Sequence, residues 1–166
     1  MKSTMTTVIE APAEIVFRWL AESDRLKQWV PSLVEDEPIV ETPQKIGSKF
    51  RQVFVEKGKT MEMTGEITEF VENKNLRVIM DGDMFGLDVG YRLESVNDSQ
   101  TEVTQNTQIK FKGFSKLMAP IFWLISKLSK NNSQLQAHAK LKEMAEQEYQ
   151  SRLGQSHPNP GIRPPV

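Results

Sequence analysis

Residues 60–71 read TMEMTGEITEFV, and this stretch decides the fold. Its odd-numbered residues from Met61 to Ile67 are apolar or glycine, and its even-numbered residues are Thr or Glu. Side chains of a β-strand alternate between the two faces of a sheet, so this period of two predicts a strand with one covered and one wet face. A helix would instead place its apolar residues at steps of three and four.

The same pattern continues on both sides of this stretch. We expect further strands at about 3–10, 33–42, 47–57, 75–81, 85–96 and 101–112. Short turn signals separate the later runs, among them Lys57-Gly58-Lys59 and Asp81-Gly82-Asp83. Connections of this length favour antiparallel pairing between strands that follow one another in the chain.

Two short helices are expected after the first strand. Ala11-Pro12 ends that strand, and Pro12 suits the first turn of a helix because its missing N–H costs nothing there. One apolar face then follows at helical spacing, made of Ile15, Val16, Trp19 and Leu20. Ser23-Asp24 can cap a second short helix, which carries Trp29 and ends before Pro31.

A long helix is predicted at about 114–152, with apolar residues, Leu135 and Leu141 among them, recurring at steps of three and four, and Gly154 is expected to end it. Pro120 and the cluster 131–133 are expected interruptions, so the element is either one helix or two, 115–130 and 133–152. Together these elements predict an α+β domain in which a six- to seven-stranded antiparallel sheet curls around the C-terminal helix. We expect this single domain over residues 1–153 and a flexible Pro-rich tail over 154–166.

Composition excludes several classes of function. The 166 residues contain no Cys and only two His, which argues against a disulfide framework, a zinc ribbon, a Cys nucleophile and a multi-His metal site. The formal net charge of −1 argues against a nucleic-acid binder. The N-terminal residues lack the apolar stretch of a signal peptide, and the longest apolar run, 117–125, is too short to span a bilayer. We therefore expect a cytoplasmic protein.

Charge is distributed unevenly along the chain. Residues 1–102 carry a net charge of −7, and residues 103–142 carry seven Lys and no acidic residue. Within the basic part, 114–130 contains more large apolar residues than one helix face can hide. Such a segment can be a half-buried helix with Lys stems along its side, a gate or homodimer contact, or a helix at a membrane surface.

A search for catalytic residues yields weak candidates. His138 lies on the apolar stripe of the long helix, where a packed histidine is more common than a catalytic one. Tyr91 can donate a hydrogen bond to a ligand carbonyl, although a structural hydroxyl is the more common role. The acidic run 35–37 can bind a cation but is more typical of a solvated strand end. We expect no catalytic residue, no metal site and no cofactor.

Four separated stretches carry a family resemblance. They are VIEAPAEIVF (8–17), LKQWVPS (26–32), GEITEF (65–70) and NLRV (75–78). In this order they resemble the START-like superfamily, and within it the bacterial polyketide cyclase/dehydrase-like (SRPBCC) proteins. The resemblance covers about residues 3–150 and implies a helix-grip fold with a cavity between sheet and helix. The superfamily includes ligand carriers, cyclases and protein-interaction modules, so the fold does not decide the function.

We therefore predict binding or transport of a small hydrophobic molecule, such as a lipid or polyketide-like compound, in that cavity. The alternatives are a cyclase or dehydratase that uses the same cavity, and a peripheral membrane or protein-interaction module built on 114–130. Eight Met and eight Phe offer an adaptable apolar lining. The predicted lining residues are Trp29, Phe50, Phe54, Met61, Met63, Met80, Phe85, Leu87, Tyr91, Gln105, Thr107, Ile121, Phe122, Ile125 and His138.

Overall fold

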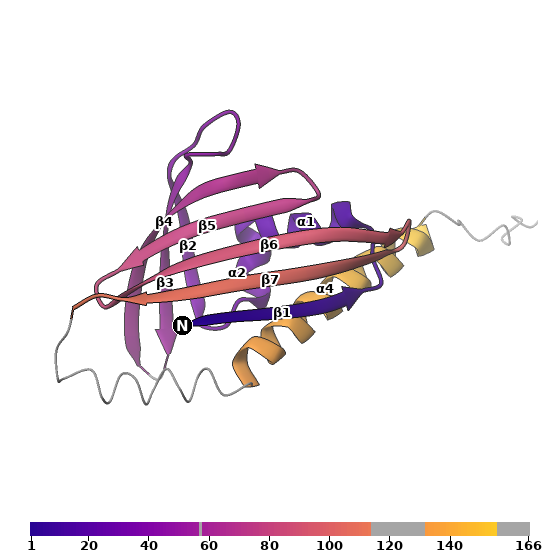
Figure 1. The fold of residues 1–166 in the computed structure, drawn as a ribbon. Coiled ribbons are helices and arrows are strands. Elements are labelled where there is room, and N and C mark those ends of the chain that lie inside the picture. The colour runs from indigo at the N-terminus through magenta and orange to yellow at the C-terminus, as the bar shows by residue number, and fades with distance from the viewer. Residues whose placement is uncertain (57, 114–131, 156–166) are drawn as a thin grey trace, which may run out of the picture.

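The computed structural model describes residues 1–56, 58–113 and 132–155 (Figure 1). Strand β1 (Lys2–Ile9) leads into helices α1 (Ala13–Ala21) and α2 (Ser23–Trp29). The chain continues with β2 (Leu33–Val40), β3 (Lys49–Glu56), β4 (Lys59–Val71), β5 (Asn75–Gly82), β6 (Phe85–Asn97) and β7 (Gln100–Phe111). Helix α4 (Asn132–Gln155) completes the described part. The strands and both short helices lie within a few residues of the predicted positions.

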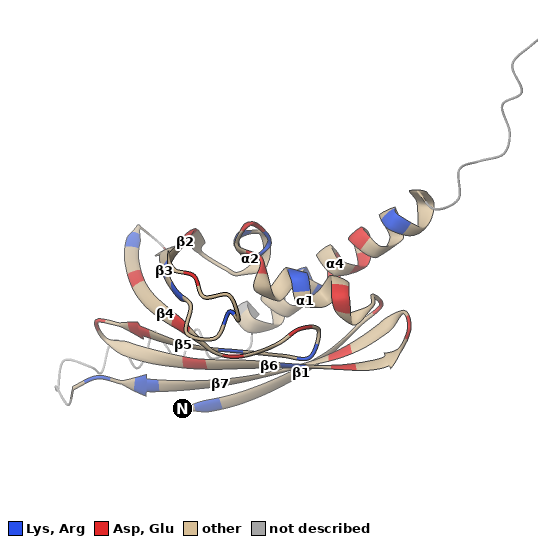
Figure 2. Ribbon diagram, turned by 90° about the horizontal axis from the view of Figure 1, so that it is seen from above, with Lys and Arg blue, Asp and Glu red and all other residues tan. Residues whose placement is uncertain are grey.

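All seven described strands form one antiparallel sheet in the order β1-β7-β6-β5-β4-β3-β2. Strands β1 and β2 are therefore its two edges. The described helices lie on one side of the sheet, which we call the inner face (Figure 2). The other side, the outer face, carries the polar residues of the alternating pattern, such as Thr64 and Arg77. The prediction of an α+β helix-grip architecture is confirmed.

The sheet bends because its long strands contain irregularities. The pairing of β4 with β5 shifts between Ile67 and Glu69, and that of β6 with β7 shifts between Ser95 and Asn97. A bulge of this kind bends its strand and increases the local twist. The sheet thereby curves toward the helices.

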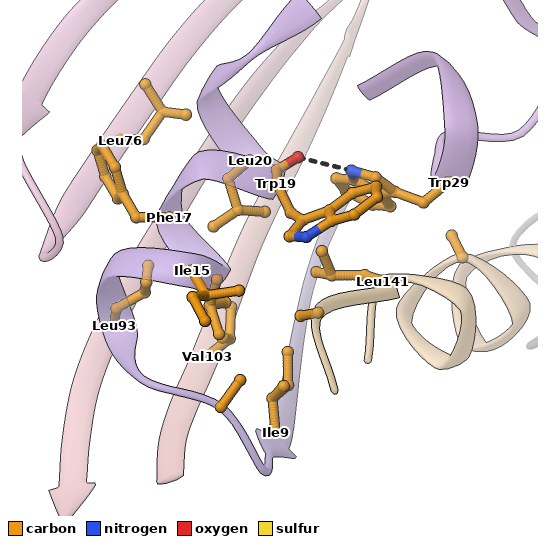
Figure 3. Packing of buried hydrophobic residues seen from close by; sticks show 14 residues of the cluster. Ile9, Ile15, Phe17, Trp19, Leu20, Trp29, Leu76, Leu93, Val103 and Leu141 are labelled. Atoms are coloured by element: carbon orange, nitrogen blue, oxygen red, sulfur yellow. Dashed lines mark hydrogen bonds between the residues drawn. The ribbon is translucent and has the colours of Figure 1, made fainter. Parts of the chain in front are cut away.

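The packed core lies where α1, α2 and α4 meet the sheet (Figure 3). Ile9, Val103 and Leu141 have no exposed surface, so strand β1, strand β7 and helix α4 meet there without water. Trp29 is 3% exposed, and its indole Nε1 donates to the backbone oxygen of Trp19 over 2.8 Å. This bond fixes α2 against α1 and satisfies the polar atom of a buried indole.

Helix α4 is tied to the short helices by the carboxylate of Glu148. It accepts a hydrogen bond from Trp19 Nε1 at 2.8 Å and one from Arg152 Nη2 at 2.7 Å, and it contacts the guanidinium of Arg25. Burial raises the pKa of Glu148, but the bonds from Arg25, Arg152 and Trp19 more than offset this and keep the pKa below its usual value. Glu148 therefore stays charged in the folded protein at neutral pH.

Side chains also form hydrogen bonds with backbone groups at both edges of the sheet. On the β1 edge, Lys142 Nζ donates to the Val8 oxygen at 2.8 Å, and Glu146 Oε1 accepts from the Glu10 N–H at 2.8 Å. On the β2 edge, Ser23 Oγ donates to the Asp36 oxygen at 2.9 Å. The helices thus bind edge positions where a further strand would otherwise pair.

The structure corrects two details of the C-terminal prediction. Helix α4 continues through Gly154 to Gln155, although Gly154 was expected to end it. Leu135 was expected on the buried stripe but is 51% exposed. Residues 114–131 and the tail from 156 onward lie outside the described residues, so the helix predicted over 115–130 stays a prediction.

Among the described helices, none combines the length and the apolar character that a bilayer crossing requires.

We predict that Glu148→Gln lowers the free energy of unfolding by about 2 kcal/mol, because it weakens charged hydrogen bonds at a mostly buried position. Urea denaturation monitored by circular dichroism measures the change. Glu143→Gln is the matched control, since Glu143 lies on the same helix, is exposed and, among the described residues, accepts a hydrogen bond from Gln147 alone. Equal losses in the two variants would contradict this role for Glu148.

Candidate functional site

The residues of the inner face follow from strand pairing. Leu93 and Val103 pack in the core below the helices, and they are partners across β6 and β7. Because side chains alternate along a strand, every second residue from these two also lies on the inner face. This places Tyr91 and Gln105, which are partners in the register, on the helix side of the sheet.

The inner face divides into two halves. The half under α1 and α4 is dry, with Ile9, Val103, Leu141 and Ala145 fully buried. In the other half, apolar side chains keep part of their surface accessible. We call it the open half; its partly accessible members are Phe50, Phe54, Met61, Phe85, Leu87, Tyr91 and Gln105.

The floor of the open half is formed by fully covered residues on the central strands. Met63 is 1% exposed and Met80 is 6% exposed, and Thr107 pairs with buried Val89 across β6 and β7. The sheet therefore offers an apolar floor with accessible side chains around it, which is the composition of a typical small-molecule site.

Gly65 gives the open half part of its shape. A Cβ built on Gly65 would lie 2.2 Å from Cζ of Phe50, so the phenyl ring lies directly over this residue. Phe50 and Gly65 are register partners on β3 and β4. A glycine here lets the ring lie close to the sheet instead of standing up from it.

A chain of polar side chains crosses the boundary between the two halves. Thr7 Oγ1 lies 2.8 Å from Nδ1 of His138, whose Nε2 contacts Oε1 of Gln105. The Gln105 amide nitrogen donates to Thr107 Oγ1 at 3.1 Å. His138 is 2% exposed, and burial lowers its pKa below the ordinary value. The imidazole is therefore neutral at pH 7.

Tyr91 is the other titratable inner-face group beside this chain. Its side chain is half-buried, and burial raises the pKa of the phenol. The hydroxyl therefore keeps its proton at neutral pH and is available as a hydrogen-bond donor.

A second group of bonded polar side chains on the inner face consists of Gln52 and Asp36, and the sequence analysis did not predict it. Gln52 is 7% exposed on the inner face between Phe50 and Phe54, and its amide nitrogen donates to Asp36 Oδ1 at 3.0 Å. A polar residue among alternating Phe residues was the available signal. In the sequence Asp36 stands between two other acidic residues, a pattern typical of a solvated strand end, so its bond to Gln52 was not expected.

The neighbours Glu35 and Glu37 do belong to a wet surface. Both pair with Arg51 on the outer face, at 2.8 and 3.5 Å, while Asp36 lies on the opposite side of the strand. Within the described residues, no group of three His, Cys, Asp or Glu is arranged to hold a metal ion.

The structure places the predicted lining residues in three groups. Trp29 lies in the packed core, bonded to Trp19, and not at the open half. Ile121, Phe122 and Ile125 lie outside the described residues. The remaining predicted residues share the inner face of the sheet or, in the case of His138, contact it from α4. That a ligand touches them stays a prediction.

A separate hollow of about 450 Å³ lies on the outer face over Gly90. Two of its charged groups bind each other: Arg77 donates to Asp88 through Nε at 2.8 Å and Nη2 at 2.7 Å. Because this hollow is solvent-exposed and lined by charged residues, it does not suit a hydrophobic ligand.

Comparison with known proteins supports this architecture. A family model described as "Activator of Hsp90 ATPase homolog 1-like protein" matches residues 10–139. No curated protein sequence matches the chain.

Solved structures with similar folds share little sequence with the chain. The ZhuI aromatase/cyclase from Streptomyces sp. R1128 has a TM-score of 0.74 at 11% identity, covering 98% of this chain and 99% of that one. A START superfamily protein from Mycobacterium smegmatis has a TM-score of 0.68 at 16% identity, with coverages of 91% and 98%. A protein from Thermus thermophilus has a TM-score of 0.70 at 18% identity, with coverages of 87% and 97%.

At these identities the solved structures establish the fold alone. The family model spans most of the chain, from the end of β1 into α4. The fold is thus similar to that of a START superfamily protein, and the chain belongs to the activator of Hsp90 ATPase homolog 1-like family.

Proposed function

We propose that the protein binds a small hydrophobic molecule, of a lipid or polyketide-like kind, on the open half of the inner face. The observation that carries the proposal is the contrast within one face. The half under α1 and α4 has several side chains with no exposed surface, whereas the open half keeps Phe50, Leu87 and other large apolar side chains partly accessible. An apolar ligand would cover that surface.

Burial of apolar surface is the expected source of affinity. At about 25 cal/mol per Å², covering about 200 Å² of apolar surface contributes about 5 kcal/mol before ordering costs. Met61, Met63 and Met80 add side chains that adapt to ligands of different shape. Such a site favours a class of molecules of similar size over one exact structure.

The polar groups of the open half would orient the ligand. Gln105, Thr107 and Tyr91 lie on adjacent strands beside the apolar floor, with His138 behind Gln105. A few such groups in an apolar site typically fix the position of a ligand's polar end.

The cyclase or dehydratase alternative uses the same face. The observation in its favour is the protonated phenol of Tyr91, which would polarise a carbonyl. It predicts turnover of a keto substrate that falls sharply in Tyr91→Phe, and undiminished turnover would remove this candidate group. The alternative based on 114–130, with a membrane-surface contact or homodimer, concerns residues outside the described part.

We predict that Leu87→Glu abolishes binding of the neutral fluorescent probe N-phenyl-1-naphthylamine, because a carboxylate in the open half opposes an apolar ligand. Fluorescence titration measures the affinity, and native mass spectrometry of the purified protein shows any bound ligand. Ile79→Glu is the control, since Ile79 is 47% exposed and lies on the outer face of β5. Unchanged probe binding in Leu87→Glu would contradict the proposed site.

We also predict that Gly65→Ala weakens probe binding several-fold, because the new methyl group forces the Phe50 ring up from the sheet into the open half. The overpacking should lower stability by about 1 kcal/mol. Gly90→Ala is the matched control, because a Cβ there meets only Arg77 Cγ at 3.8 Å. Equal probe affinity in both variants would show that Phe50 does not border the site.

A further prediction concerns the pH dependence of stability. Because burial lowers the pKa of His138 below its ordinary value of about 6.5, the unfolded chain binds more protons than the folded one below that pH. The free energy of unfolding should therefore be constant from pH 8 to 7 and fall as pH drops from 7 to 5, above the range in which the carboxylates titrate.

Urea denaturation at each pH measures this dependence. His138→Gln should remove most of the slope between pH 7 and 5. A slope that persists in His138→Gln would assign it to another group.

A further inference from the structure

The four polar side chains at the boundary of the open half form a directed chain of hydrogen bonds. It runs from Thr7 on β1 through His138 on α4 to Gln105 and Thr107 on β7. Each member is at least half-buried, so each bond forms away from bulk water.

The donor at each step follows from what each group can do. Oε1 of Gln105 only accepts, so the Nε2 atom of His138 that contacts it must carry the hydrogen. A neutral imidazole has one N–H, which leaves Nδ1 as the acceptor for the Thr7 hydroxyl. The Gln105 amide group, oriented by this contact, presents its NH₂ to Thr107 Oγ1.

Thr107 is the last member of the chain. Its oxygen accepts from Gln105, so its own hydrogen remains to be donated, and no described residue is recorded as accepting it. Thr107 is 9% exposed, and its cross-strand partner Val89 is apolar. The hydroxyl hydrogen therefore lies at the floor of the open half.

We propose that the chain of bonds through His138 presents the Thr107 hydroxyl as a donor to the bound molecule, so that the preferred ligand carries an uncharged acceptor oxygen, as in a ketone, ester or ether. This inference rests on the proposed function. A ligand carboxylate would lose its hydration beside Val89, at a large cost in free energy, because the four hydrogen-bonded side chains are neutral and offer it no cation. A pure hydrocarbon would leave the hydroxyl hydrogen unpaired.

The donor and acceptor order of these hydrogen bonds can be tested without a ligand. Long-range ¹H–¹⁵N correlation spectra at pH 8 distinguish the two neutral imidazole forms, and we expect the Nε2–H form for His138. His138→Gln identifies the signal. The Nδ1–H form would reverse every bond, make Thr107 donate to Gln105, and overturn the proposal.

The ligand class can be tested with two probes that differ in one group. 2-Acetylnaphthalene carries a carbonyl where 2-ethylnaphthalene carries a methylene group, and both are measured by displacement of N-phenyl-1-naphthylamine. In Thr107→Val the ratio of ketone affinity to hydrocarbon affinity should fall about fivefold, the usual worth of one neutral hydrogen bond. Using the ratio cancels the difference in hydration between the probes.

Two variants complete the test. Thr107→Ser retains the hydroxyl and should retain the wild-type ratio. Thr104→Val removes a hydroxyl from the other face of the same strand, where Thr104 bonds Thr6, and should also leave the ratio unchanged. An unchanged ratio in Thr107→Val would overturn the ligand class alone, whereas failure of N-phenyl-1-naphthylamine to bind at all would overturn the proposed function.

Discussion

Helix α4 rests on the sheet through an apolar contact that excludes water, in which Leu141 and Ala145 share the core with Ile9 and Val103. A helix with its side chains is about 10 Å wide, whereas seven strands spaced about 4.8 Å apart span roughly 29 Å. Helix α4 lies along β1, the edge strand, so within the described chain it packs directly against one side of the sheet only. The open half is thus a geometric result of a wide sheet and a helix placed at its side.

The same contact decides which polar groups meet. His138 lies one helical turn before Leu141, so the packing of Leu141 brings the imidazole over β1 and β7, within reach of Thr7 and Gln105. Polar groups are expensive in an apolar face unless they bond each other. Among the described residues no buried side-chain nitrogen or oxygen is without a partner. The inner face therefore combines an apolar surface with polar groups whose orientation is already set.

Sequence patterns predicted the strands well because alternation is local: TMEMTGEITEFV shows its period of two without knowledge of its neighbours. The candidate residues on β3 to β7 could be placed on one face for the same reason. Trp29 could not be assigned, since an amphipathic indole suits a core and a pocket mouth equally, and only the bond to Trp19 decides between them. The partners of His138 depend on the register of β1 with β7 and on the rotation of α4, neither of which is visible in the residues themselves.

The occupied strand edges have a consequence for behaviour at high protein concentration. An open sheet can recruit strands from other molecules wherever its edge offers unpaired N–H and C=O groups. Lys142 and Glu146 bind such groups of Val8 and Glu10, and Ser23 binds the oxygen of Asp36 at the opposite edge. Strand β2 also contains Pro38, which has no N–H to donate to an incoming strand. The helices that pack on the inner face thereby also protect the sheet against self-association into β-aggregates.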